Sequence, residues 1–200
     1  KYIFIKLSML LYSIYCVVFS LFTLFLFDKF LLFGEPDKNK LIDDGFNIDI
    51  EFAGNLRPEQ LPVVDKFKKA CIEKGGGLIS LPCGFGKTII ALKIITELKK
   101  KTIIIVHKEF LLNQWKERIK EFIPTANIGL IQAKTIDIKN KDIVLAMLQS
   151  ISMKDYPDDM FDCFQFSIID ECHHIAAEVF SKSLPKIACL YNLGLSATPK

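Results

Sequence analysis

The chain has 200 residues, of which 50% are hydrophobic and 24% are charged, and its net charge is only +3. This composition allows one ordinary domain with a substantial core plus an appendage, and so small a positive charge neither requires nor excludes a nucleic-acid partner. The 6 cysteines show no C-x-x-C spacing, which argues against a zinc knuckle or a disulfide framework and favours a reducing compartment.

The first segment, residues 1–33, is strongly apolar. Residues 7–27 carry no charge, and about 20 apolar residues are enough to span a bilayer as a helix. Lysines precede and follow this stretch, so the positive-inside rule gives no orientation. Three interpretations are open: a membrane anchor, a buried helix of a domain outside this chain, or accidental translation of A/T-rich DNA, which we favour slightly over the anchor.

The next residues connect this segment to the main domain. Residues 34–45 combine glycine, proline and mixed charges, and they are predicted to form a linker. Residues 47–52 alternate between apolar and polar side chains, which predicts a short strand. Residues 57–74 are predicted to form a helix with Pro58 in its first turn, and its inward face is Leu61, Val64, Phe67, Lys68 and Cys71.

From residue 75 onward, strand and helix patterns alternate. We predict strands at residues 78–81, 102–106, 127–131, 142–147, 164–169 and 191–195, and helices at 87–100, 109–122 and 178–184. This alternation predicts an α/β domain, with a mostly parallel sheet covered by helices on both faces. Ligands of such sheets bind at the carboxyl ends of the strands.

A glycine-rich loop, residues 81–88, separates the strand at 78–81 from the following helix. Gly84 and Gly86 allow the backbone to close around phosphates. Lys87 can reach the β- and γ-phosphates of a nucleotide, and the hydroxyl of Thr88 can bind Mg²⁺. The strict phosphate-loop consensus begins with glycine, where this chain has leucine, so a plain glycine turn with a solvated lysine is the alternative.

An acidic pair follows the apolar strand that ends at Ile169. Asp170 in this position can hold Mg²⁺, directly or through water, and Glu171 can orient and deprotonate an attacking water. The alternative is an acidic helix N-terminus, which the helix dipole favours. The presence of the glycine loop in the same domain favours the catalytic interpretation.

These motifs resemble those of superfamily 2 helicases of the DExH type, especially the XPB-like and large-DNA-virus helicases. The resemblance covers about residues 46–200, which would form an ATP-binding RecA-like domain. The glycine loop resembles motif I, and Asp170-Glu171-Cys172-His173 resembles motif II. Further matches are Arg57-Pro58-Glu59-Gln60 to the adenine-reading segment, Val106-His107-Lys108 with Gln114-Trp115 to motif Ia, Leu148-Gln149-Ser150 to a nucleic-acid-contacting element, and Ser196-Ala197-Thr198 to motif III.

The resemblance implies a role for each matched position. ATP would be held by the adenine-reading and loop residues, namely Arg57, Gln60, Pro82, Cys83, Gly84, Phe85, Gly86, Lys87 and Thr88. Lys87, Asp170 and Glu171 would serve catalysis, with Thr88 and Asp170 binding Mg²⁺. Coupling of nucleotide state to nucleic-acid grip would fall to His173, Ser196 and Thr198, and contact with the strand to His107, Lys108 and Gln149. Motif Ia usually has Pro-Thr where this chain has His107-Lys108. Trp115 is interpreted as a core residue.

The implied function is ATP-dependent unwinding of, or translocation on, nucleic acid, with DNA favoured over RNA by analogy alone. The chain starts at Lys1 and stops at Lys200 directly after a motif, so we expect a fragment whose second RecA-like domain is missing. By itself this fragment is expected to bind ATP weakly, if at all, to hydrolyse it very slowly and not to unwind nucleic acid. The alternatives are a restriction or remodelling ATPase that does not separate strands, and an inactive truncated product. The expected location is cytoplasmic or nuclear (a viral factory if the protein is viral), or membrane-tethered if residues 7–27 are an anchor.

Overall fold

The computed structural model describes residues 47–157, 159–172, 187 and 189–197. The apolar segment 1–33, the predicted linker 34–45 and the predicted helix 178–184 therefore lie outside the described residues. Within the part of the chain that is described, no helix is long and apolar enough to cross a membrane.

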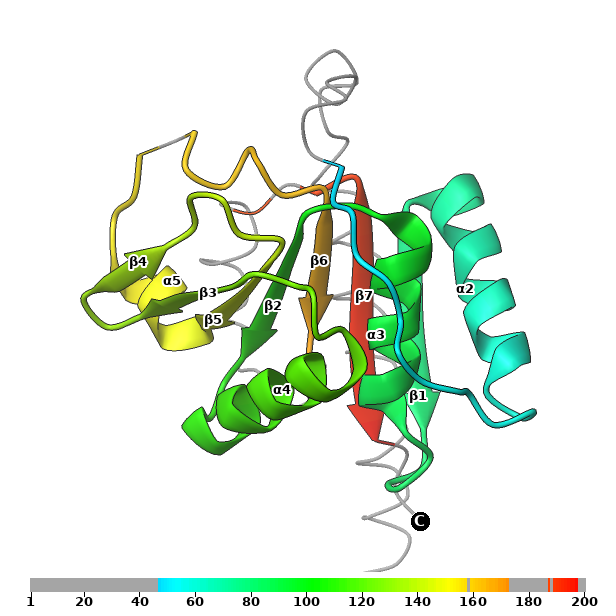
Figure 1. The fold of residues 1–200 in the computed structure, drawn as a ribbon. Helices are drawn as coiled ribbons and strands as arrows, with labels where there is room; N and C mark the ends of the chain where they lie inside the picture. Colours follow the sequence, from blue (N-terminus) through cyan, green and yellow to red (C-terminus); the bar gives the residue numbers. More distant parts are fainter. Residues whose placement is uncertain (1–46, 158, 173–186, 188, 198–200) are drawn as a thin grey trace, which may run out of the picture.

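A seven-stranded sheet forms the centre of the domain, in the order β1-β7-β6-β2-β5-β3-β4 (Figure 1). Every neighbouring pair is parallel except β3 and β4, which pair antiparallel at one edge. The strands are β1 (Gly76–Leu81), β2 (Thr102–Val106), β3 (Ile128–Gln132), β4 (Thr135–Asp137), β5 (Ile143–Met147), β6 (Phe166–Ile169) and β7 (Tyr191–Ala197). The predicted mostly parallel sheet is confirmed.

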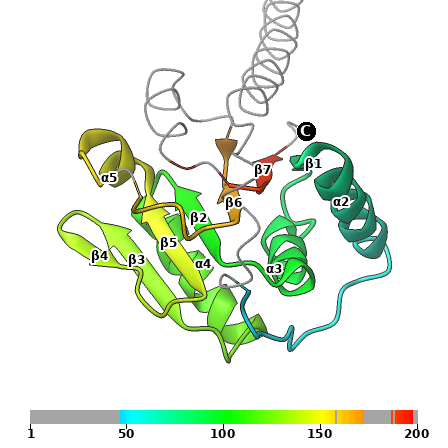
Figure 2. The same cartoon turned by 90° about the horizontal axis from the view of Figure 1, so that it is seen from above.

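Helices and connecting segments cover both faces of this sheet, as predicted. On one face lie α2 (Leu61–Lys74), α3 (Lys87–Leu98) and α4 (Glu109–Phe122), and α5 (Leu148–Met153) lies on the other (Figure 2). Alternate residues of β2 therefore enter different cores: Ile104 packs in the core beneath α2, α3 and α4, and Ile103 packs in the core beneath α5. Because both faces are covered, β2 is buried along its whole length.

The elements with the clearest periodicity have the predicted boundaries. β2 spans Thr102–Val106 and α4 spans Glu109–Phe122. The β-branched run of β2 suits a strand buried on two faces. In α4, Leu111, Trp115 and Ile119 recur at helical spacing and are buried. The other strands predicted after residue 75, and α3, are present with ends shifted by one or two residues.

The strand predicted at 47–52 is not formed, although the predicted alternation of buried and exposed residues is present. Ile48 and Ile50 are buried while Asp49 between them is exposed. This stretch makes only an isolated bridge to Lys100. Ile48 N donates to Lys99 O, and Ala53 N, directly after this stretch, donates to Phe122 O. Because an extended segment crosses the C-terminal ends of α3 and α4, the two-residue periodicity arises without a neighbouring strand.

The predicted helix at 57–74 begins later than expected, at Leu61. Residues 57–60 form a turn instead, closed by a hydrogen bond from Gln60 N to Arg57 O at 2.9 Å. The proline of the first helical turn is therefore Pro62 rather than Pro58, which suits a position where no N–H donor is needed. Val64, Phe67 and Cys71 are buried as predicted, whereas Leu61 is half exposed.

Two short elements, β4 and α5, were not predicted. All residues of β4 are exposed, so no burial pattern marks it in the sequence. α5 has six residues, too few for a helical period to be recognised. α5 contains Gln149, one of the predicted nucleic-acid residues.

Candidate nucleotide site

The glycine loop joins the end of β1 to the start of α3. Gly84 has φ 83° and Gly86 has φ 90°, in the left-handed region that favours glycine. Phe85 N donates to Pro82 O at 3.2 Å, and Gly86 is the N-cap of α3. The free N–H groups at the start of α3 and its dipole make this loop a ready anion site. Cys83 is exposed.

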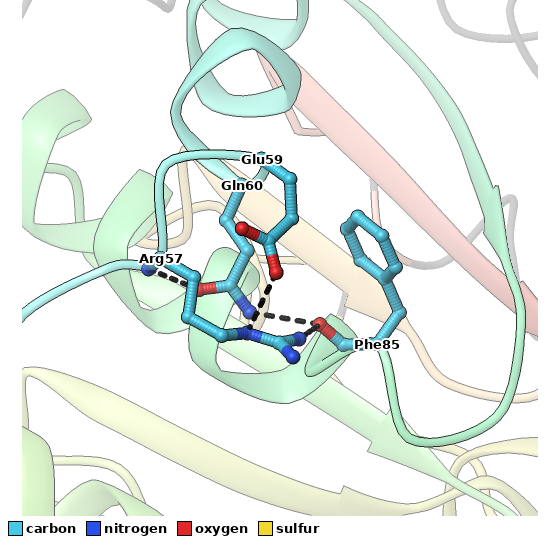
Figure 3. A network of polar contacts seen from close by, with 4 residues as sticks. All are labelled: Arg57, Glu59, Gln60 and Phe85. Carbon is cyan, nitrogen blue, oxygen red and sulfur yellow. Dashed lines mark hydrogen bonds and ion pairs between the residues drawn. The ribbon is translucent and has the colours of Figure 1, made fainter.

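A group of polar contacts braces the loop from outside (Figure 3). Gln60 Nε2 donates to the carbonyl of Phe85 at 2.8 Å, and an Arg57 guanidinium N–H donates to the same oxygen. The guanidinium also lies 5.5 Å from the centre of the Phe85 ring and pairs with Glu59 at 3.3 Å. Gln60 Oε1 accepts from Arg57 N at 2.9 Å. The two predicted adenine-reading residues therefore contact the glycine loop, and Gln60 is only 2% exposed.

Asp170 lies directly after β6 and is buried. Its backbone N–H donates to Ile105 O at 3.0 Å, which continues the pairing of β6 with β2. Its Oδ2 accepts from the indole N–H of Trp115 at 2.7 Å, and its Oδ1 accepts from Glu171 N at 2.9 Å. Burial raises the pKa of Asp170, while the Trp115 hydrogen bond and the charge of Lys87 oppose that rise.

The sheet brings Lys87, Asp170 and Glu171 to the same end, where the parallel strands finish. β1, β7 and β6 are parallel neighbours, so the loop after β1 and the acidic pair after β6 leave the sheet at the same end. Lys87 is the first residue of α3, directly after the loop, and its Nζ donates to Leu81 O at 3.1 Å. Glu171 has φ 50°, in the left-handed region that is uncommon for residues other than glycine, and three loop or helix-end residues away from the acidic pair share it.

Three predicted nucleic-acid residues also come together at this end of the sheet. Gln149, at the start of α5, donates from Nε2 to His107 O at 3.0 Å, which joins the segments after β2 and β5. Lys108 is the N-cap of α4, and its Nζ lies 5.9 Å from the ring centre of the exposed Phe110. Among the predicted coupling residues, Ser196 lies near the end of β7, and His173 and Thr198 lie outside the described residues.

The interpretation of Trp115 as a core residue is incomplete. Trp115 is buried, at 1% exposed, but its indole N–H also contacts the acidic pair. A buried tryptophan usually needs a partner for its N–H group. That requirement was available in the sequence, because Trp115 falls on the inward face of a predicted helix, but the sequence does not identify the partner.

A family model described as the Type III restriction enzyme, res subunit, matches residues 53–200. The chain belongs to this family. The matched region includes the glycine loop, the acidic pair and every described residue of the sheet end. The expected resemblance to superfamily 2 helicases is confirmed at the family level.

Two curated relatives of this res-subunit family member show how similar it is to named helicases and translocases. The chain is 40% identical over 172 residues to "Putative ATP-dependent RNA helicase L396" of Acanthamoeba polyphaga mimivirus, covering 86% of the chain and 32% of the relative. It is 34% identical over 132 residues to "DNA 3'-5' translocase XPB2" of Sulfurisphaera tokodaii, covering 66% and 29%. The chain thus spans about a third of the length of these relatives.

Solved structures share the fold of this res-subunit domain. The Sulfolobus solfataricus SWI2/SNF2 ATPase core in complex with dsDNA matches with a TM-score of 0.62 at 19% identity, over 79% of the chain and 34% of that structure. The UvsW helicase from bacteriophage T4 matches with a TM-score of 0.58 at 18% identity, over 80% and 58%. At this identity the matches establish the helicase type of RecA-like fold alone.

Proposed function

We propose that this chain is the ATP-binding domain of an ATP-dependent nucleic-acid helicase or translocase. The observation that carries the proposal is that the glycine loop with Lys87 and the Asp170-Glu171 pair follow strands that end on the same side of one parallel sheet. Family membership and the printed names of the relatives, which include an ATP-dependent helicase and a DNA translocase, support the same function.

The loop residues are proposed to hold the triphosphate. Backbone N–H groups around Gly84 and Gly86 and the N-terminus of α3 would donate to the phosphates. Lys87 would exchange its contact with Leu81 O for the β- and γ-phosphate oxygens. Beyond its hydrogen bonds to Arg57 N and Phe85 O, Gln60 keeps one N–H and one oxygen lone pair, which is the pair of groups that an adenine edge requires.

The residues at the sheet end fit Mg²⁺, which prefers oxygen ligands. Each oxygen of Asp170 accepts one hydrogen bond, and a carboxylate has about four lone-pair sites, so each oxygen keeps capacity for a further ligand. Asp170 and the Thr88 hydroxyl at the start of α3 would hold the ion. When bound, Mg²⁺ would neutralise charge that develops on the phosphates.

The proposed reaction is attack of water on the γ-phosphate. The water oxygen forms a bond to phosphorus, the bond from phosphorus to the β–γ bridging oxygen breaks, and ADP leaves with that oxygen. Glu171 would orient the water and accept its proton. Lys87 would stabilise the leaving oxygens, because its ammonium can follow the negative charge as it builds up.

His107, Lys108 and Gln149 are proposed to contact the backbone of a nucleic-acid strand, and DNA is favoured over RNA. The XPB2 relative is named as a DNA translocase and the L396 relative as an RNA helicase, so the preference rests on analogy.

A second RecA-like domain would complete the groove that holds the nucleic acid. It would also add the arginine that, in related phosphoryl transfer, raises rates by about 10³–10⁵. Ser196 is proposed to couple the nucleotide site to the nucleic-acid contacts. A translocase that does not separate strands is the second candidate, because the family model is described from a restriction enzyme.

The test is nucleotide binding by the 200-residue chain with Lys87→Ala. We expect at least a tenfold loss of affinity for a fluorescent ADP or ATP analogue with Mg²⁺, because an ammonium on a phosphate chain makes charge-assisted contacts. Lys116→Ala, which removes an exposed lysine from the solvent side of α4, is the charge-matched control and should bind normally. Equal affinity of the unsubstituted and Lys87→Ala chains would refute the assignment of the loop.

A further inference from the structure

Trp115 is the only tryptophan of the chain, and its place in the core does not explain why a tryptophan is needed. Its side chain is 1% exposed and packs in the core beneath α2, α3 and α4. Aliphatic or phenylalanine side chains would fill such a core without burying a polar N–H group, which is costly when it lacks a partner. The indole N–H meets this cost by donating to Asp170 Oδ2 at 2.7 Å.

Asp170 has the complementary requirement. It is a carboxylate only 7% exposed, so it needs donors, and a hydrogen bond to an ionised acceptor is stronger than one between neutral groups. The backbone of Asp170 is held by the bond from its N–H to Ile105 O, which leaves the direction of the carboxylate to the side-chain contacts. Trp115 holds Oδ2 and the N–H of Glu171 holds Oδ1.

We propose that Trp115 is a positioning residue, whose indole N–H holds the Asp170 carboxylate in the orientation that binds the nucleotide-associated Mg²⁺. This inference rests on the proposed function, since it assigns a task to a residue that touches neither nucleotide nor metal. With one donor on each oxygen, rotation of the carboxylate is restricted while a lone pair on each oxygen stays available. Partners of this kind orient metal ligands, and their removal typically lowers metal affinity about 10–100-fold.

The first test compares Trp115→Phe with the unsubstituted chain, using a fluorescent ADP analogue at a series of Mg²⁺ concentrations. Phenylalanine keeps an aromatic ring in the core and removes only the donor and part of the ring volume. We expect the Mg²⁺ concentration for half-maximal binding to rise about tenfold, while ADP affinity in excess EDTA stays unchanged. Ile119→Val, one turn further along the same buried face of α4, is the packing control and should not change the Mg²⁺ dependence.

The second test needs neither activity nor a substituted Trp115. Because the chain has one tryptophan, its ¹⁵N-labelled indole gives a single N–H resonance. We expect a strongly deshielded, slowly exchanging proton that moves upfield in Asp170→Asn, where the acceptor is neutral. We also expect ADP with Mg²⁺ to shift this resonance more than ADP with EDTA.

The outcomes separate this inference from the proposed function. An unsubstituted chain that binds ADP more tightly with Mg²⁺ than in EDTA, together with a Trp115→Phe chain of equal Mg²⁺ dependence, would overturn the positioning role and leave the proposed function intact. An indole resonance unchanged by Asp170→Asn would do the same, even if Trp115→Phe does not fold. An unsubstituted chain without Mg²⁺-dependent binding would contradict the proposed function and the positioning role together.

Discussion

At the scale of single residues, the two glycines of the loop have different surroundings despite similar backbone angles. A Cβ on Gly84 would meet nothing within 4 Å, whereas a Cβ on Gly86 would lie 2.5 Å from Gln60 Nε2. Both positions have φ values that strain any residue with a Cβ. Gly86 therefore has a second, steric reason to be glycine, because Gln60 reaches over it to the carbonyl of Phe85.

This difference predicts unequal effects for the two alanine substitutions. Gly84→Ala should lower the free energy of unfolding by about 1 kcal/mol, the cost of a left-handed residue with a Cβ. Gly86→Ala should cost about 2 kcal/mol, because Gln60 must also move and lose a hydrogen bond worth about 1 kcal/mol. Urea unfolding of the two variants measures both values.

A double substitution isolates the contribution of Gln60. In a Gln60→Ala background the clash is gone, so Gly86→Ala should cost no more than Gly84→Ala. Equal costs for the two glycine substitutions in the presence of Gln60 would show that the bracing contact does not stabilise the loop.

At the scale of elements, α2 and α3 are joined by an ion pair beside their packed apolar faces. Glu97 of α3 accepts from Lys68 of α2 at 2.8 Å and pairs with Lys93, one turn earlier in α3, also at 2.8 Å. These hydrogen bonds lower the pKa of Glu97 from 4.5 to about 2. A carboxyl whose pKa is lowered by folding stabilises the fold above its unfolded pKa, and this contribution is lost as the pH falls toward the folded value.

Glu97→Gln should therefore lower the free energy of unfolding at pH 7, by about 1 kcal/mol, since the pair is partly exposed and screened by solvent. The difference between Glu97→Gln and the unsubstituted chain should shrink as the pH falls from 4.5 toward 2. Urea unfolding across this range measures it. Glu73→Gln breaks a more exposed pair with Lys69 at 3.7 Å and should have little effect. A difference for Glu97→Gln that stays constant with pH would contradict the ionic origin.

Whether the sequence predicts an element depends on how clear an apolar pattern that element leaves. β2 and α4 have the predicted boundaries because burial on two faces and on one face, respectively, leaves a clear apolar pattern. The segment at 47–52 has the pattern of a strand, yet it packs on helix ends, because alternation reports an extended chain with one side buried and not its pairing. The exposed β4 leaves no such pattern.

At the scale of the whole molecule, chain order and strand polarity were enough to predict that the loop and the acidic pair meet. Both follow parallel strands of one sheet, and the carboxyl ends of such strands lie at the same end of the sheet. Contacts between side chains were beyond the sequence. The indole N–H of Trp115 reaches Asp170 across 55 positions, and Gln60 reaches Phe85 across 25, and nothing local in the sequence identifies either partner. The roles predicted for the site residues stay predictions.

The central claim is that one Mg²⁺-bound nucleotide contacts Lys87 and Asp170 together. A crystal structure of the chain with Mg²⁺ and a non-hydrolysable ATP analogue tests it directly. We predict phosphate oxygens within hydrogen-bonding distance of Lys87 Nζ, and Mg²⁺ either about 2.1 Å from an Asp170 oxygen or one water away from it. A nucleotide bound elsewhere on the domain, or a metal ion held without Asp170, would contradict the claim.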